Sequence, residues 1–68
     1  MITITVNGEK RQVQKDATVS DLLAELGITA GRRVAVERNR GIVKRETWDT
    51  TAIQHGDVFE IIEFVGGG

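Results

Sequence analysis

The residues of this chain that are best suited to chemistry lie at its end, where the sequence reads Val65-Gly66-Gly67-Gly68. Glycine loses more conformational entropy on ordering than any other residue and has no side chain to bury, so these glycines do not help a fold. Three extended residues project roughly 10 Å, and without Cβ atoms they fit a narrow channel. We predict a flexible tail in which Gly66 and Gly67 provide clearance and the carboxylate of Gly68 is the reactive group.

Such a carboxylate must be activated before it can react. A terminal carboxyl group has a reference pKa of about 3.3–3.7, so at neutral pH it is an anion and a poor electrophile. Conversion to a thioacid, an ester or an amide therefore requires a mixed anhydride such as an acyl-adenylate. The internal glycines lack the spacing of a phosphate-binding loop. We therefore expect ATP and magnesium to be held by a partner enzyme, and no cofactor to be bound by this chain.

The rest of the sequence contains few residues of the types that carry out catalysis. It contains no cysteine, which excludes disulfides, thiolate nucleophiles and cysteine-ligated zinc or iron–sulfur sites, and we expect no metal site. The single histidine, His55, lies in a predicted turn without an obvious partner, and we interpret it as a surface residue. The chain is therefore predicted to be a substrate of other enzymes and not an enzyme itself.

Length and charge restrict the setting in which this chain works. Its 68 residues allow one compact domain. A formal net charge of −1 gives no overall attraction to nucleic acid or to anionic lipid. The apolar stretches are only a few residues long, which is too short for a membrane span or a signal-peptide core. We expect a cytoplasmic protein, monomeric when free, that binds neither nucleic acid nor membranes.

Alternating apolar and polar residues predict a strand over residues 1–6. The apolar residues that share one face of this strand are Ile2, Ile4 and Val6. Asn7-Gly8 readily adopts the positive φ angles of a tight hairpin turn. The return strand, residues 9–14, is mostly polar apart from Val13, which suits the edge of a sheet. The chain is therefore predicted to begin with a hairpin.

Between residues 17 and 27 the spacing of apolar residues changes to that of a helix. The apolar stripe consists of Val19, Leu22, Leu23 and Leu26. Thr18 is placed to cap the first turn, and Asp21 three residues later completes a shortened capping box. Gly27 is placed to close the last turn in the left-handed conformation, and Ile28 is placed to contact Leu23. Both ends of a short amphipathic helix are therefore predicted.

The second half of the chain is predicted to complete a mixed sheet. The expected elements are a strand over 33–37, a short strand at 42–43, an irregular stretch with one helical turn over 44–53, and a final strand over 58–64. Trp48 is interpreted as a core residue below the irregular stretch. One helix on one face of four to five strands, with the last strand central, is an α+β fold of the ubiquitin-like β-grasp type. We predict a β-grasp domain over residues 1–64 and the tail over 65–68.

The final strand is predicted to have one buried and one exposed face. Phe59 is expected to point toward the helix, whereas Ile62 and Phe64 point outward beside Ala35. An exposed apolar patch beside a reactive tail is typical of a docking surface. We predict that Ala35, Ile62, Phe64 and Val65 contact partner proteins.

The order of elements and three short motifs resemble the ThiS family of sulfur carriers in thiamin biosynthesis. The motifs are VAVERN at residues 34–39, Gly56-Asp57 and the ending Glu63-Phe64-Val65-Gly66-Gly67-Gly68. Ubiquitin-like carriers in general share the Gly67-Gly68 pair, whereas VAVERN with FVGGG at this length narrows the resemblance to ThiS. The sequence departs from the family pattern in predicted loops, at Arg40, Lys44 and His55.

This resemblance implies a specific series of reactions at the carboxylate of Gly68. A ThiF-like, E1-like enzyme would adenylate its carboxylate, and a sulfur donor enzyme would supply the sulfur of a C-terminal thiocarboxylate. The thiocarboxylate would then deliver that sulfur to the thiazole synthase ThiG. Two alternatives keep the same tail chemistry, namely a MoaD-like carrier for molybdopterin and a ubiquitin-like modifier.

An alternative of another class is an RNA-binding module of the TGS kind. It draws on the basic residues Arg32, Arg33, Arg38, Arg40, Lys44 and Arg45, which fall in one short window with a single acid. The same residues could equally form a solvated rim or guide the chain toward an acidic partner. An RNA-binding module would need aromatic stacking on the sheet and would give the terminus no special role.

Overall fold

The computed structural model describes residues 1–29 and 31–64. The elements in chain order are strands β1 (Ile2–Val6) and β2 (Glu9–Val13), helix α1 (Val19–Glu25), strands β3 (Val34–Arg38) and β4 (Gly41–Ile42), the 3-10 helix η1 (Arg45–Thr47) and strand β5 (Val58–Glu63). Within these residues five strands form one sheet in the order β2-β1-β5-β3-β4. Strands β1 and β5 are parallel, and the other neighbours are antiparallel.

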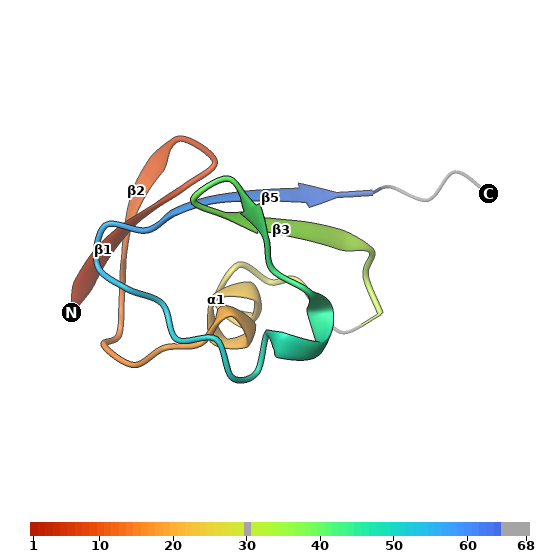
Figure 1. Ribbon diagram of the computed structural model, residues 1–68, viewed down its shortest axis with the longest axis horizontal. Helices are drawn as coiled ribbons and strands as arrows, with labels where there is room; N and C mark the ends of the chain where they lie inside the picture. Colours follow the sequence, from red (N-terminus) through yellow and green to blue (C-terminus); the bar gives the residue numbers. More distant parts are fainter. Residues whose placement is uncertain (30, 65–68) are drawn as a thin grey trace.

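The sheet and the helix form two layers, with α1 below one face of the sheet (Figure 1). The last strand is central and the polar strand β2 is at an edge, as the sequence predicts. The predicted β-grasp arrangement of one helix and a mixed sheet is therefore confirmed. Strand ends differ from the prediction by about one residue, because β3 covers Val34–Arg38 and β5 ends at Glu63. The predicted tail, residues 65–68, lies outside the described residues.

Two tight turns of the same kind join the antiparallel pairs at the ends of the sheet. Asn7 and Gly8 connect β1 to β2 with φ angles of 49° and 85°. Asn39 and Arg40 connect β3 to β4 with φ angles of 51° and 74°. Positive φ at both central residues matches the right-handed twist of the flanking strands. Arg40 is costlier at its position than glycine, because its Cβ atom crowds the backbone in this conformation.

Both predicted ends of helix α1 are present. The Thr18 hydroxyl accepts a hydrogen bond from the Asp21 N–H at 3.2 Å, and the Asp21 carboxylate accepts one from the Thr18 N–H at 2.9 Å. At the other end Gly27 has φ of 78°, and the Ile28 N–H donates to the Leu23 carbonyl at 2.9 Å. These bonds satisfy backbone groups that a short helix would otherwise leave unpaired.

The core fills the space between α1 and the sheet. Its buried members are Ile4, Val6, Val13, Ala17, Val19, Leu22, Leu23, Val36, Ile53, Phe59 and Ile61. Phe59 of β5 and Leu22 of α1 are fully buried, so the central strand and the helix meet at the middle of the core. Burying a side chain of this size contributes about 1.5–3 kcal/mol. All of this packing is on one side of the sheet.

Trp48 closes one side of the core, as predicted. It packs partly buried against the core cluster, and its indole N–H donates to the Val43 carbonyl at 3.0 Å. The Arg45 guanidinium lies 4.8 Å from the ring centroid, in a cation–π contact. The irregular stretch with one helical turn is therefore held against the helix side of the sheet by its tryptophan.

Candidate functional site

Strand β5 determines where the predicted tail leaves the domain. It lies between β1 and β3, and both neighbours bond to its backbone. On one side the Thr5 N–H donates to the Asp57 carbonyl at 2.9 Å, and on the other the Phe64 N–H donates to the Arg33 carbonyl at 2.8 Å. Backbone pairing thus continues to the last residue that the structure describes. The position from which residue 65 follows is fixed by the sheet itself.

The side chain of Asn7 extends the pairing of β1 with β5. Its carboxamide nitrogen donates to the Ile61 carbonyl at 3.1 Å, and its carboxamide oxygen accepts from the Ile61 N–H at 2.8 Å. Because β1 ends at Val6, this carboxamide takes the place that the next peptide group of a longer strand would have. The Asn7-Gly8 turn signature predicts the turn but gives no sign of this second role of Asn7.

Asn39, in the equivalent turn at the other hairpin, holds the beginning of β5. Its backbone N–H donates to the Val58 carbonyl at 2.8 Å, and its side-chain oxygen accepts from the Val58 N–H at 2.9 Å. Its side-chain nitrogen donates to Asp57, which is only 5% exposed. Asp57 also accepts from the Gln54 N–H at 2.8 Å and lies 3.4 Å from the Arg38 Nε. Both asparagines therefore anchor the central strand.

The face of the sheet opposite α1 carries an exposed apolar surface. We call it the open face, and its apolar members are Ala35, Ile42, Val58, Ile62 and Phe64. Ile62 is 52% exposed and Phe64 56% exposed, so the predicted outward orientation of both is confirmed. Ala35 is half-buried and pairs with Ile62 across β3 and β5. Within the described residues α1 packs on the other face, and Figure 1 shows this side of the sheet without a covering helix.

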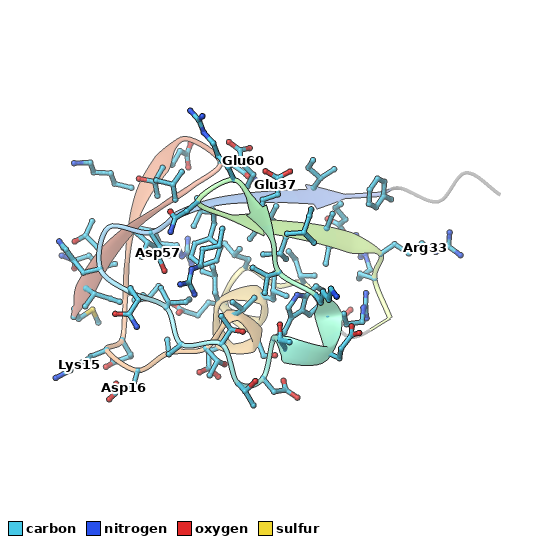
Figure 2. All side chains as sticks on the ribbon, in the orientation of Figure 1. Lys15, Asp16, Arg33, Glu37, Asp57 and Glu60 are labelled. Carbon is cyan, nitrogen blue, oxygen red and sulfur yellow. The ribbon has the colours of Figure 1, made fainter. Side chains whose placement is uncertain are left out.

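The open face also carries two carboxylates that the sequence pattern alone does not single out. Glu37 of β3 and Glu60 of β5 are directly opposite each other in the antiparallel register. Figure 2 shows their side chains together on the side of the sheet away from α1. The alternation of β5 would have placed Glu60 on this face, but pairing it with Glu37 requires the register between two strands that are distant in sequence.

The six basic residues of the 32–45 window do not form one surface. Strand β3 separates Arg32 and Arg33 at its beginning from Arg38 and Arg40 at its end. Arg38 pairs with the buried Asp57, Arg32 pairs with Glu63, and Arg45 stacks on Trp48. Figure 2 shows Arg33 extending from the molecule near the end of β5. Three of these six cations are therefore engaged within the described residues, which weakens the case for a continuous RNA-binding surface.

His55 is an exposed residue whose Nδ1 atom accepts a hydrogen bond from the Thr3 N–H at 3.1 Å. This contact ties the turn before β5 to β1, in keeping with a surface role. Across residues 1–29 and 31–64 there is no group of three His, Asp or Glu residues able to hold a metal ion. In the same part of the chain no helix is long and apolar enough to cross a membrane.

Comparison with known proteins gives one consistent family. The model of the ThiS family matches residues 4–68. The chain belongs to the ThiS family. It is 38% identical over 66 residues to the sulfur carrier protein ThiS of Bacillus subtilis, covering 96% of this chain and 98% of that protein. The crystal structure of the thiamine biosynthesis protein ThiS from Geobacter metallireducens superposes with a TM-score of 0.81 at 35% identity, over 98% of this chain and 100% of that one.

Two further relatives are much longer than this chain. It is 45% identical over 65 residues to a thiazole synthase of Paramagnetospirillum magneticum and 40% identical over 65 residues to one of Magnetococcus marinus. In each case 96% of this chain matches, but only 20% of the relative. A ThiS-like region thus forms about a fifth of these two thiazole synthases.

Membership of the ThiS family confirms the resemblance drawn from VAVERN and the glycine ending. The predicted carrier role agrees with the name of the Bacillus subtilis relative, a sulfur carrier protein. The predicted docking residues Ala35, Ile62 and Phe64 all lie on the open face, whereas Val65 lies outside the described residues, as do Gly66, Gly67 and Gly68.

Proposed function

We propose that this chain carries sulfur for thiazole formation in thiamin biosynthesis, as a thiocarboxylate on Gly68. The observation that carries the proposal is the family match, which extends through the glycine ending to residue 68. The geometry of β5 supports it, because backbone bonds hold this strand up to Phe64, only four residues before Gly68. Four extended residues span at most about 14 Å, so a reactive Gly68 would stay within that reach of the docking surface.

The proposed chemistry takes place in two steps at the Gly68 carboxylate. First, a carboxylate oxygen attacks the α-phosphorus of ATP, and pyrophosphate leaves to give an acyl-adenylate. Second, a sulfur nucleophile, hydrosulfide in the simplest case, attacks the acyl carbon, and AMP leaves to give the thiocarboxylate. The activating enzyme holds ATP and magnesium in this proposal, and Gly66 and Gly67 let the chain reach its active site without Cβ atoms in the way.

Two partners are proposed besides a sulfur donor enzyme. A ThiF-like, E1-like adenylating enzyme would bind the open face through Ala35, Ile62 and Phe64, contact Val65 as well, and receive the tail. A ThiG-type thiazole synthase would then accept the sulfur. The second assignment is supported by the two relatives that are named thiazole synthase and contain a region similar to this chain. The chain is proposed to be monomeric when free and to work in the cytoplasm.

Intact-mass spectrometry tests this function directly. The chain is incubated with its cognate ThiF-like enzyme, ATP, magnesium and sulfide, and we expect a mass gain equal to the exchange of one oxygen for sulfur. Tandem mass spectrometry should locate the change at Gly68. Omission of ATP should leave the mass unchanged. If the complete reaction leaves the mass unchanged, or if sulfur is added elsewhere, the proposal is wrong.

The predicted docking role of Phe64 can be tested separately from the chemistry. Phe64→Asp places a charge in the exposed apolar surface and should weaken binding to the activating enzyme at least tenfold, or about 1.4 kcal/mol. Gln14→Asp adds the same charge at an exposed position just after β2 and should leave binding unchanged. Both variants should keep the far-ultraviolet circular dichroism of the parent, since neither position is buried. Equal binding by both variants would remove Phe64 from the interface.

A further inference from the structure

The pairing of Glu37 with Glu60 places two like charges at the middle of the open face. Their strands are adjacent and the two residues are direct partners in the register. Among the described residues the ion pairs are Arg32–Glu63 and Arg38–Asp57, so neither Glu37 nor Glu60 has a cation within ion-pair distance. Like charges directly opposite each other on a sheet are destabilising. Among the described residues no ion pair offsets this repulsion.

Exposed isoleucines of β4 and β5 flank the two carboxylates. Ile42 pairs with Glu37 from β4, and the next outward residue of β5 after Glu60 is Ile62. Ile42 and Ile62 are 68% and 52% exposed. A partner that covers these isoleucines also removes water from the carboxylates between them. Buried charges without a counter-charge are strongly unfavourable, so a partner that fits this surface must bring a cation to this point.

We propose that Glu37 and Glu60 together bind one arginine or lysine side chain of the activating enzyme, at the centre of an apolar interface on the open face. The choice of occupant rests on charge complementarity and on continuity, because the same strand β5 leads from Glu60 through Ile62 to Phe64 and the tail. Two carboxylates on adjacent strands suit the several N–H donors of a guanidinium group. The inference rests on the proposed function, since it assigns the partner that first receives the tail.

Lys10 and Arg40 of the described domain form no ion pair with either carboxylate. Lys10 faces the same side of the sheet, but it belongs to β2, where it pairs with Thr5 of β1. Strand β1 therefore lies between Lys10 and β5. Arg40 lies in the turn after β3 and takes part in neither of the ion pairs formed among the described residues. The site is therefore open to a cation from outside the chain.

The experiment compares two double variants that lose the same charge. Glu37→Gln with Glu60→Gln removes the pair from the open face, whereas Glu9→Gln with Glu25→Gln removes two exposed carboxylates from β2 and α1. Affinity for the cognate ThiF-like enzyme is measured by calorimetry at low and at moderate salt. We expect the first double variant to bind at least tenfold more weakly at low salt and with a shallower salt dependence. The control should bind within about twofold of the parent.

The thermal stability of the free double variant gives a second readout, which should not fall when the affinity for the enzyme falls. Removing the like-charge pair should leave the melting temperature of the free chain unchanged or raise it, so weaker binding would not reflect unfolding. If both double variants bind the enzyme equally well, the inference is wrong. Weaker binding by the first variant together with a lower melting temperature would also overturn it, because the pair would then be structural.

The outcomes also separate this inference from the proposed function. If the parent chain gains sulfur and Glu37→Gln/Glu60→Gln binds like the control, the proposed cation site is refuted and the proposed function stands. If the double variant binds the activating enzyme normally but loses affinity for the thiazole synthase, the occupant is misassigned and the inference as stated fails. If the parent is neither bound nor modified by the activating enzyme, the proposed function fails and this inference fails with it.

Discussion

Substitution of Asn7 by glycine isolates the contribution of its side chain to the central strand. The turn needs φ of 49° at this residue, and glycine adopts such an angle without strain. What is lost is the pair of hydrogen bonds to Ile61, at 3.1 and 2.8 Å in a part-buried setting. At about 0.5–1.5 kcal/mol each, the loss is about 1–3 kcal/mol. A domain of this size has only about 3–5 kcal/mol to lose.

Urea denaturation of Asn7→Gly should therefore show a lower midpoint with an unchanged slope. The melting temperature should fall by about 4–8 °C for each kcal/mol. Hydrogen exchange provides a local check, because the Ile61 N–H should exchange faster than in the parent. Asn7→Asp keeps the acceptor for this N–H but loses the donor to the Ile61 carbonyl, so it should retain more protection at Ile61. Parent-like stability and exchange in Asn7→Gly would refute the idea that the carboxamide extends β1.

Three further substitutions test other parts of the structure. Arg40→Gly should stabilise the domain by about 1 kcal/mol, because Arg40 has φ of 74°; a lower urea midpoint would contradict this. Thr18→Ala should cost about 1 kcal/mol through loss of the helix cap, measured by thermal denaturation; an unchanged midpoint would show that the cap contributes nothing. Gly67→Val should leave stability within about 0.5 kcal/mol and abolish adenylation, measured as pyrophosphate release; retained activity would exclude passage of the tail through a narrow channel.

Local features of the fold were predictable because their determinants are close together in the sequence. The capping box of Thr18 and Asp21 and the closure by Gly27 each depend on residues within a few positions. The two faces of β5 follow from simple alternation, and the burial of Phe59 beside exposed Val58 confirms it. The exact strand ends depend on pairing with distant partners, which alternation does not specify.

The parts of the site that were missed depend on contacts between residues distant in sequence. Asn7 bonds to Ile61, 54 residues later, and a turn signature does not indicate where the side chain of its asparagine points. The facing of Glu37 and Glu60 is set by the register of β3 on β5. The separation of the basic residues has the same cause. They lie at opposite ends of β3, and Arg32, Arg38 and Arg45 have acidic or aromatic partners that sequence proximity does not reveal.

Strand β5 separates the side chains that pack in the core from the side chains to which the proposed function assigns partner binding. Its buried side chains, Phe59 and Ile61, pack toward α1, whereas Glu60 and Ile62 face solvent on the open face. Because each neighbour in sequence faces the opposite side, a change that tunes docking need not disturb the core, and the backbone bonds on both edges keep the strand in place. This separation requires that substitutions at residues 60, 62 and 64 change partner affinity with little effect on folding, whereas substitutions at 59 and 61 change folding first.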